Sequence, residues 1–184
     1  MQHLKHIVTA AFLVVFCVTL FTTANLTNSQ TEYFRVKSHL VFDKKFFGKV
    51  FVIDGDSLKV GGKEVRLFGV DAPEYSQTCF DAKKEEYACG HVSLEFTKKL
   101  AGGKIAECVY AEQDKYDRYL SKCRIDELSI NEELVKNGMA VVYNFTESDE
   151  KMDALEAAAK QQKLGIWQGA FQLPKNYRKD HPRN

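Results

Sequence analysis

The sequence FFGKVFVIDGDSLKVGGKEVRLFGV, residues 46–70, contains three short apolar runs separated by turn residues. The runs cover residues 46–53, 57–60 and 63–70 and are rich in Val, Ile, Leu and Phe, which favour strands. Asp54-Gly55-Asp56 separates the first two runs, and Gly61-Gly62 separates the last two. Both are turn signals, and the glycine pair is typical of a tight hairpin. We therefore predict three successive strands.

The segment that follows indicates a helix and two more strands. Val92, Phe96 and Leu100 recur every four residues and form one apolar stripe, which Gly102-Gly103 ends. Residues 104–112 and 119–125 then have the composition of two strands joined by a polar loop.

Two further helices are predicted toward the C-terminus. Ser129 and Glu132 have the spacing of a capping box, and Gly138 supplies the stop. Thr146 and Asp149 mark another helix start. Its inner face is formed by apolar residues at helical spacing, namely Met152, Leu155 and Ala159, and Gly165 lies past its end.

The order of elements predicts the fold class. Three strands, a helix, two strands and two helices make an α+β protein with a five-stranded sheet interrupted after its third strand. This order indicates a small Greek-key barrel of the OB type with about three helices.

Composition limits the class of protein. The chain has 184 residues, of which 45% are hydrophobic and 28% charged, so it is neither a disordered segment, a fibrous repeat nor a multi-span membrane protein. Its formal charge of +1 argues against a protein that coats nucleic acid by bulk positive charge. Positive charge is concentrated near the C-terminus, where residues 160–184 hold six basic residues and one acidic residue.

The N-terminus has the pattern of a secretory signal peptide. Lys5 precedes an apolar run over residues 7–21, and the small residues Thr22 and Ala24 follow at the spacing of a cleavage site. We expect residues 1–24 to be a signal peptide, 25–39 a linker, 40–170 the folded domain and 171–184 a basic tail. An uncleaved membrane anchor stays open as the alternative, since the run is only slightly short for a span.

Removal of residues 1–24 takes away Cys17 and leaves four cysteines: Cys79, Cys89, Cys108 and Cys123. An even number in an exported chain indicates two disulfides, for which three pairings are possible. A zinc site is the competing interpretation, because His91 is close to Cys89, but the chain has no Cys-x-x-Cys pair.

Five charged side chains lie near the predicted turns: Asp56, Arg66, Asp71, Glu74 and Arg118. Taken one at a time, each has an ordinary interpretation as a turn residue or a surface ion pair. Taken together and in order, with the Lys115-Tyr116-x-Arg118 element and Leu164-Gly165-Ile166-Trp167 near the end, they resemble the staphylococcal nuclease (thermonuclease) family. The resemblance covers about residues 48–167 and implies the same OB-type barrel.

The resemblance implies a role for each residue in the hydrolysis of phosphodiester bonds. Asp56, Asp71 and the backbone carbonyl of Ala72 would hold a calcium ion, and other divalent cations stay possible, because oxygen ligands suit hard cations. Glu74 would be the general base. Arg66 and Arg118 would bind phosphate oxygens through their guanidinium forks and stabilise charge in the transition state.

Further residues that could contact the nucleic acid are predicted from weaker patterns. Lys115 and Tyr116 match family positions that contact a terminal phosphate or nucleotide, and Tyr143 is a candidate for stacking on a base. A solvated lysine and packing tyrosines are the ordinary alternatives. Asp117 stands where family members usually have Gly, and Asp tolerates the left-handed backbone that such a turn needs.

The predicted strands suggest the cysteine pairing. Cys108 and Cys123 fall on the two strands that flank the loop of Arg118, which favours a Cys108–Cys123 bridge. Cys79 and Cys89 would then close the segment between Glu74 and the helix.

The sequence thus predicts a secreted or periplasmic calcium-dependent endonuclease, with the anchored form as its alternative location. By resemblance it would act on DNA and RNA, preferably single-stranded or locally open, leave 3′-phosphate ends and work as a monomer without a protein partner. A catalytically silent OB-type module that only binds nucleic acid is the alternative function.

Overall fold

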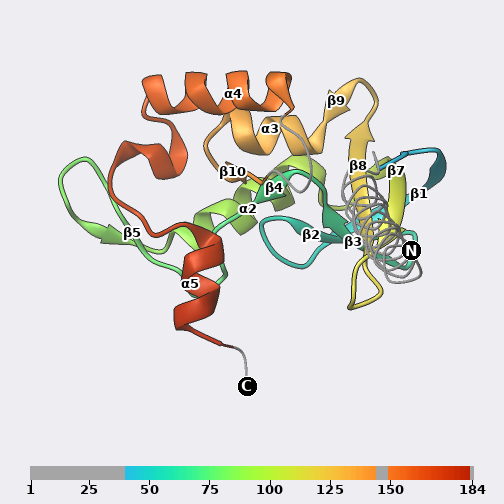
Figure 1. Cartoon of the computed structure of the whole chain (residues 1–184), viewed down its shortest axis with the longest axis horizontal. Coiled ribbons are helices and arrows are strands. Elements are labelled where there is room, and N and C mark those ends of the chain that lie inside the picture. The colour runs from blue at the N-terminus through green and yellow to red at the C-terminus, as the bar shows by residue number, and fades with distance from the viewer. Residues whose placement is uncertain (1–39, 144–148, 183–184) are drawn as a thin grey trace, which may run out of the picture. The chain divides into compact units, whose positions relative to one another are not determined.

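The structure, a computed structural model, describes residues 40–143 and 149–182 of the chain. Five of its strands form a closed barrel, and Figure 1 labels each of them. The barrel strands are β1 (Lys44–Val52), β2 (Ser57–Val60), β3 (Lys63–Leu67), β7 (Ile105–Gln113) and β8 (Tyr119–Ile125). They are paired in the order β3-β2-β1-β7-β8, and the parallel pairing of β3 with β8 closes the ring. The predicted α+β fold with an OB-type barrel is therefore confirmed.

The glycine pair makes the predicted hairpin between β2 and β3. Val60 is paired with Lys63, and the two residues between them, Gly61 and Gly62, have φ angles of 56° and 86°. Positive φ at both central positions is what a tight hairpin with the right-handed twist of strands requires. Gly48 on β1 lies against this turn, since a Cβ atom there would be 2.4 Å from the Gly61 Cα atom.

The three predicted helices are present. They are α2 (Cys89–Ala101), α3 (Ile130–Lys136) and α4 (Glu150–Gln161). Ser129 caps α3 by accepting a hydrogen bond from the Glu132 amide at 3.3 Å, and Asp149 caps α4 by accepting one from the Met152 amide at 3.3 Å. Each bond satisfies an amide that the first turn of a helix leaves without a partner. Thr146, the other predicted start signal, lies outside the described residues.

The third strand is shorter than residues 63–70. Gly69 has a φ of 78°, so the chain turns out of the barrel after Leu67. The next two residues form β4 (Val70–Asp71), which pairs with β10 (Val141–Val142) and not with the barrel. This pairing brings Asp71 to the edge of the barrel beside the segment before α4.

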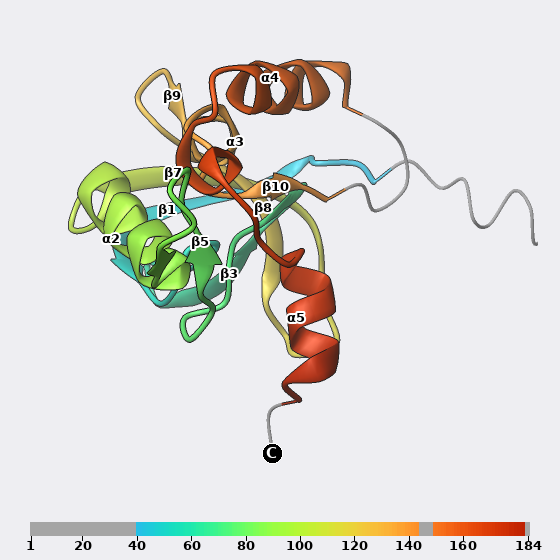
Figure 2. The ribbon, with the colours of Figure 1, turned by 90° about the vertical axis from the view of Figure 1, so that its left-hand side faces the viewer.

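Other short elements complete the fold: β5 (Cys79–Phe80), β6 (Glu86–Tyr87), β9 (Leu128–Ser129), the 3-10 helix η1 (Gly165–Gln168) and α5 (Pro174–Asp180). Helix α5 forms within the segment that sequence analysis assigns to the basic tail. In the view turned by 90°, it extends away from α4 toward the C-terminus (Figure 2).

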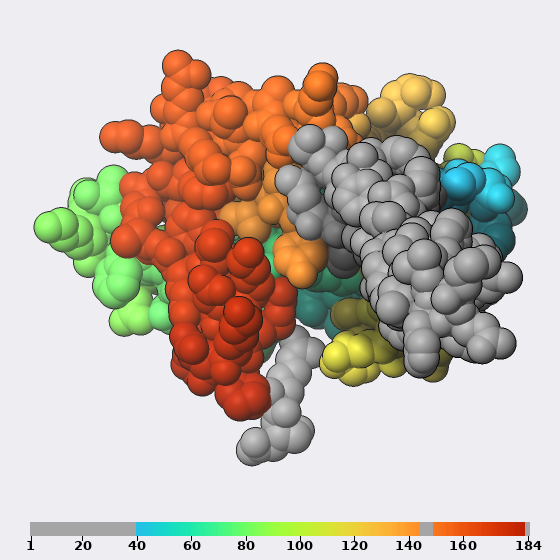
Figure 3. Space-filling view, viewed as in Figure 1, coloured from blue at the N-terminus to red at the C-terminus, as the bar shows by residue number. Residues whose placement is uncertain are grey.

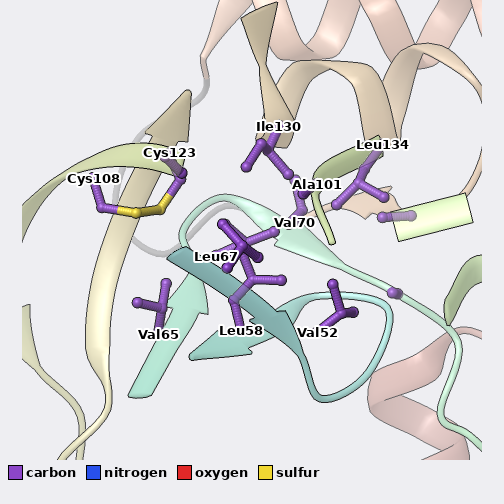
Figure 4. Close-up of a cluster of buried hydrophobic side chains, with 14 of the residues drawn as sticks. Val52, Leu58, Val65, Leu67, Val70, Ala101, Cys108, Cys123, Ile130 and Leu134 are labelled. Carbon is purple, nitrogen blue, oxygen red and sulfur yellow. A yellow bond between two sulfur atoms is a disulfide. The ribbon is translucent and has the colours of Figure 1, made fainter. Parts of the chain in front are cut away.

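The core fills the barrel and the space under α2 and α3. Figure 4 shows side chains from the barrel strands, from α2 and from α3 directed toward one another. Fully buried members include Leu58, Val65, Leu67, Val70, Ala101, Ile130 and Leu134. Packing of this kind fixes the ends of β2 and β3, where the site residues lie.

Both expected disulfides are formed. Cys108 and Cys123 face each other across β7 and β8 with their Cα atoms 4.1 Å apart, and Cys79 is bonded to Cys89 with a Cα separation of 5.6 Å. The second bridge ties the short β5–β6 hairpin to the start of α2. The expected signal peptide and linker lie outside the described residues, and no described helix has the length and apolar character of a membrane span.

Candidate active site

Arg66 joins two of the predicted metal ligands. Its Nη1 atom forms an ion pair with Asp56 Oδ1, and its Nη2 atom donates to Asp71 Oδ1 at 2.8 Å and to the Val70 carbonyl at 3.3 Å. The side chains of Arg66, Asp56 and Asp71 are 13%, 5% and 1% exposed. Asp56 comes from the turn before β2, Arg66 from β3 and Asp71 from β4, and the fold brings them together in a buried cluster.

Burial and charge act against each other at Arg66. Burial lowers the pKa of its guanidinium below the ordinary value, and the negative charges of Asp71 and Asp54 oppose that shift. The positive charge of Arg118 lowers the pKa further. Arg118 directly precedes β8, and Tyr119 of β8 is paired with Val65 of β3. The two predicted phosphate-binding arginines therefore belong to one region of the molecule.

Helix α2 supports the turn that presents Asp56. Thr97 Oγ1 donates to the Gly55 carbonyl at 2.9 Å. A Cβ atom at Gly55 would lie 2.5 Å from Ser93 Oγ and 2.7 Å from the Ala72 Cβ atom, so only glycine fits there. The amide of Ala72 donates to Asp56 Oδ2 at 2.7 Å, which fixes the Asp56 carboxylate next to the predicted third ligand.

Asp54 belongs to the same cluster, although sequence analysis treated it only as a turn residue. Its carboxylate accepts a hydrogen bond from the Asp56 amide at 3.1 Å. Burial raises the pKa of Asp54, the charge of Arg66 counteracts this, and the negative charge of Glu74 adds to it. The signal was present in the sequence as the first acid of Asp54-Gly55-Asp56.

Glu74 lies in a loop that is anchored at both ends. Its amide donates to Gln77 Oε1 at 3.2 Å, and the Gln77 amide donates to the Glu74 carbonyl at 2.8 Å. Gln77 is fully buried, and its carbonyl accepts a hydrogen bond from the Gly90 amide at 3.1 Å. A Cβ atom at Gly90 would lie 1.8 Å from the Glu74 carbonyl oxygen, so the absence of a side chain there lets the loop rest on α2.

A third arginine, which sequence analysis did not select, contacts the carboxylates. Arg178 of α5 donates from Nη1 to Asp71 Oδ1 at 2.8 Å and to Glu74 Oε1 at 2.8 Å, and from Nη2 to Asp71 Oδ2 at 3.1 Å. Burial lowers the pKa of Arg178, but the hydrogen bonds and charges of Asp71 and Glu74 outweigh it, so the pKa is raised. Arg178 thus bridges the predicted metal ligand and the predicted general base.

Arg118 is held by its own loop. Its Nε and Nη2 atoms donate to Asp114 Oδ2 at 2.9 and 2.7 Å. Burial raises the pKa of Asp114, but the hydrogen bonds from Arg118 and from two backbone amides dominate and lower it. Asp117 has a φ of 62°, the left-handed backbone expected there. The carboxylate beside Arg118 is therefore that of Asp114.

The three residues predicted to contact the nucleic acid outside the catalytic cluster lie in two places. Lys115 Nζ and Arg118 Cζ are 4.9 and 5.5 Å from the centre of the Tyr116 ring, which is in the same loop and is 65% exposed. Tyr143 follows β10 and is half-buried. It lines a pocket of about 170 Å³ beside Asp71, which α4, η1 and α5 also border through Lys160, Trp167 and Lys175.

The donor set at the centre of the site suits a hard cation. Asp56 and Asp71 turn carboxylate oxygens toward the same guanidinium, and such oxygens are the ligands that calcium and magnesium prefer. Within residues 40–143 and 149–182, no three side chains of Asp, Glu, His or Cys are grouped so that they could hold an ion. The carboxylate oxygens of Asp56 and Asp71 are suitable ligands for a divalent cation. In this structure the same oxygens form hydrogen bonds or ion pairs with Arg66 and Arg178.

Comparison with known proteins agrees with this arrangement. The family model described as "Staphylococcal nuclease homologue" matches residues 64–169. The chain is 34% identical over 122 residues to the succinoglycan biosynthesis protein ExoI of Rhizobium meliloti, a match that covers 65% of this chain and 63% of that protein.

Several of the relatives carry the name endonuclease. A protein of Escherichia coli O157:H7 named "Uncharacterized endonuclease" is 33% identical over 130 residues, covering 68% of this chain and 78% of the relative. Endonuclease YncB of Bacillus subtilis is 32% identical over 159 residues, covering 76% and 70%. With the barrel and the ordered charged residues, these matches show that the chain belongs to the staphylococcal nuclease family.

Proposed function

We propose that the protein is a metal-dependent endonuclease that hydrolyses phosphodiester bonds of DNA and RNA. The observation that carries the proposal is the cluster in which Arg66 joins Asp56 to Asp71, with Glu74 connected to Asp71 through Arg178. A protein that only binds nucleic acid has no need of buried acids beside its phosphate-binding arginine, because they repel the substrate.

The chemistry of the substrate explains the residue types. A phosphodiester is anionic and gains negative charge as phosphorus becomes five-coordinate. Arg66 and Arg118 would donate to the phosphate oxygens, where a guanidinium fork binds bidentately and stabilises the growing charge. Glu74 would accept the proton of the attacking water, since a carboxylate within reach of a water can serve as a general base.

Asp56 and Asp71, with the carbonyl of Ala72, would hold the divalent cation, which supplies positive charge opposite the phosphate. Calcium is our choice of ion, because the family resemblance implies it and because the two carboxylates are hard oxygen ligands. The resemblance also supports cleavage of the bond to the 5′-oxygen, which leaves 3′-phosphate ends. Tyr116 and Tyr143 are candidates for stacking on the bases of a single-stranded or locally open substrate.

The cysteines support a place of action outside the cytoplasm. Disulfides persist in oxidising compartments, so the bridges Cys79–Cys89 and Cys108–Cys123 support a secreted or periplasmic protein. We propose that the enzyme acts there as a monomer, after cleavage of the N-terminal signal or while anchored through it.

The test is digestion of labelled single-stranded DNA, duplex DNA and RNA by the purified protein in calcium, in magnesium and in chelator. We expect calcium-dependent cleavage and product ends that a phosphatase must treat before a ligase or polymerase can use them as 3′-hydroxyls. Binding of single strands without turnover in any of these cations would contradict the proposal and favour the binding module.

A further inference from the structure

Arg178 occupies the face of Asp71 that a cation would need. It donates to both oxygens of that carboxylate, and Oδ1 also accepts a hydrogen bond from Arg66. The Asp71 side chain is only 1% exposed, so few other approaches to its oxygens remain. The third contact of Arg178, to Glu74 Oε1, places its positive charge between the predicted ligand and the predicted base.

Helix α5 and the segment directly before it are docked by several further contacts. Tyr177 donates its hydroxyl hydrogen bond to the Ser76 carbonyl at 3.1 Å, and the Gln77 side-chain amide donates to the Gln172 carbonyl at 2.7 Å. The amide of Phe80, next to the Cys79–Cys89 bridge, donates to the Ala170 carbonyl at 2.8 Å. Residues 76–80, which lead into the segment closed by that disulfide, therefore serve as the platform for the helix that carries Arg178.

The two arginines at Asp71 differ in how firmly they are held. Arg66 is 13% exposed and reaches both aspartates from within the barrel, whereas Arg178 is 36% exposed. Arg178 also comes from a short helix, α5, whose atoms (red) lie at the surface in Figure 3. A cation that approaches Asp71 from solvent would meet Arg178 first, and Arg178 is the arginine that can move back into water.

We propose that Arg178 sets the affinity of the active site for its divalent cation by competing with that cation for the oxygens of Asp71. The inference rests on the proposed function, since it concerns the same site. A guanidinium and a metal ion both require the carboxylate lone pairs, and two positive charges at one carboxylate repel each other. Binding of the cation therefore breaks the hydrogen bonds of Arg178 to Asp71.

The position of Arg178 in the sequence makes it a feature of this chain's C-terminal segment. The family match ends at residue 169, and α5 begins at Pro174. The working unit thus extends beyond the part of the chain that the family model matches, because a residue past its end contributes charge to the site.

Isothermal titration of calcium into the full mature chain, with no nucleic acid present, tests the inference. Arg178→Ala should bind calcium about tenfold more tightly than the wild type, because charge-assisted hydrogen bonds no longer have to be broken. Arg178→Lys, which keeps the charge but loses the fork, should fall between the two. Lys179→Ala removes the same charge from the exposed neighbouring position and should change the affinity less than twofold.

Equal or weaker calcium binding by Arg178→Ala, with a circular dichroism spectrum like that of the wild type, would overturn the inference and leave the proposed function standing. An Asp71→Asn variant separates the two failures. If Asp71→Asn binds calcium as tightly as the wild type, or if the wild type and Arg178→Ala both bind none, the cation competition and the metal site of the proposed function are both wrong.

Discussion

Replacement of Arg66 by alanine is expected to lower the rate of nucleic-acid cleavage by roughly 10²–10³-fold, the usual cost of one lost donor to a transition-state oxyanion. It should also lower the free energy of unfolding by about 3 kcal/mol, because one partner of a buried charge cluster is removed. Asp56 and Asp71 would then lie buried opposite each other without their shared counterion. Calcium should restore part of the lost stability by taking the place of that charge.

Urea denaturation in chelator and in calcium measures the stability, and single-turnover cleavage measures the rate. Arg66→Lys keeps the positive charge and separates folding from the need for a guanidinium fork. Arg124→Ala is the matched control, because that arginine is 52% exposed and pairs with Glu127 at the surface. Cleavage by folded Arg66→Lys at the wild-type rate would show that the fork has no role in catalysis.

Replacement of Glu74 by glutamine is expected to lower kcat by about 10²–10⁴-fold, the range of a lost general acid or base. The change keeps the shape of the side chain, so Arg178 and the loop anchored by Gln77 should hold their positions. The affinity for a single-stranded oligonucleotide should stay within a few-fold of the wild-type value. A loss in kcat without a loss in binding is what distinguishes a base from a structural residue.

Steady-state kinetics on a labelled oligonucleotide, together with fluorescence anisotropy for binding, measure this split. Glu95→Gln on α2 is the control, since Glu95 is 69% exposed and pairs with Lys98. If the Glu74→Gln variant has the wild-type kcat, Glu74 is not the general base and another group accepts the proton.

The parts of the fold that the sequence predicted have strong local signals. The glycine pair at residues 61–62 and the cap at Ser129 each act within a few residues, so pattern and structure agree. The stripe of Val92, Phe96 and Leu100 predicted the helix α2 but not the face that it buries. Ser93, Leu94 and Thr97 are buried there, whereas Val92 is 46% exposed. The short pairing of β4 with β10 could not be predicted in this way. Two-residue strands have no periodicity, and their partners are far apart in the chain.

The same distinction applies to the site. Asp56, Arg66 and Asp71 stand at strand ends in an order that resembles a known family, and closure of the barrel brings them together. Arg178 has no such signal, because one arginine in a basic segment has the pattern of a solvated tail. Its contacts depend on the docking of α5 and of the segment before it onto residues 76–80, which only the tertiary structure displays.

Asp56 and Asp71 are proposed to hold the divalent cation on which cleavage of nucleic acid depends. The most direct measurement compares cleavage of a 5′-labelled single-stranded DNA by the wild type and by Asp56→Asn/Asp71→Asn, each in calcium and in chelator. Circular dichroism establishes that both proteins are folded. We predict cleavage by the wild type in calcium alone, and no cleavage by the double variant in either condition. Cleavage by the folded double variant at the wild-type rate would contradict the account.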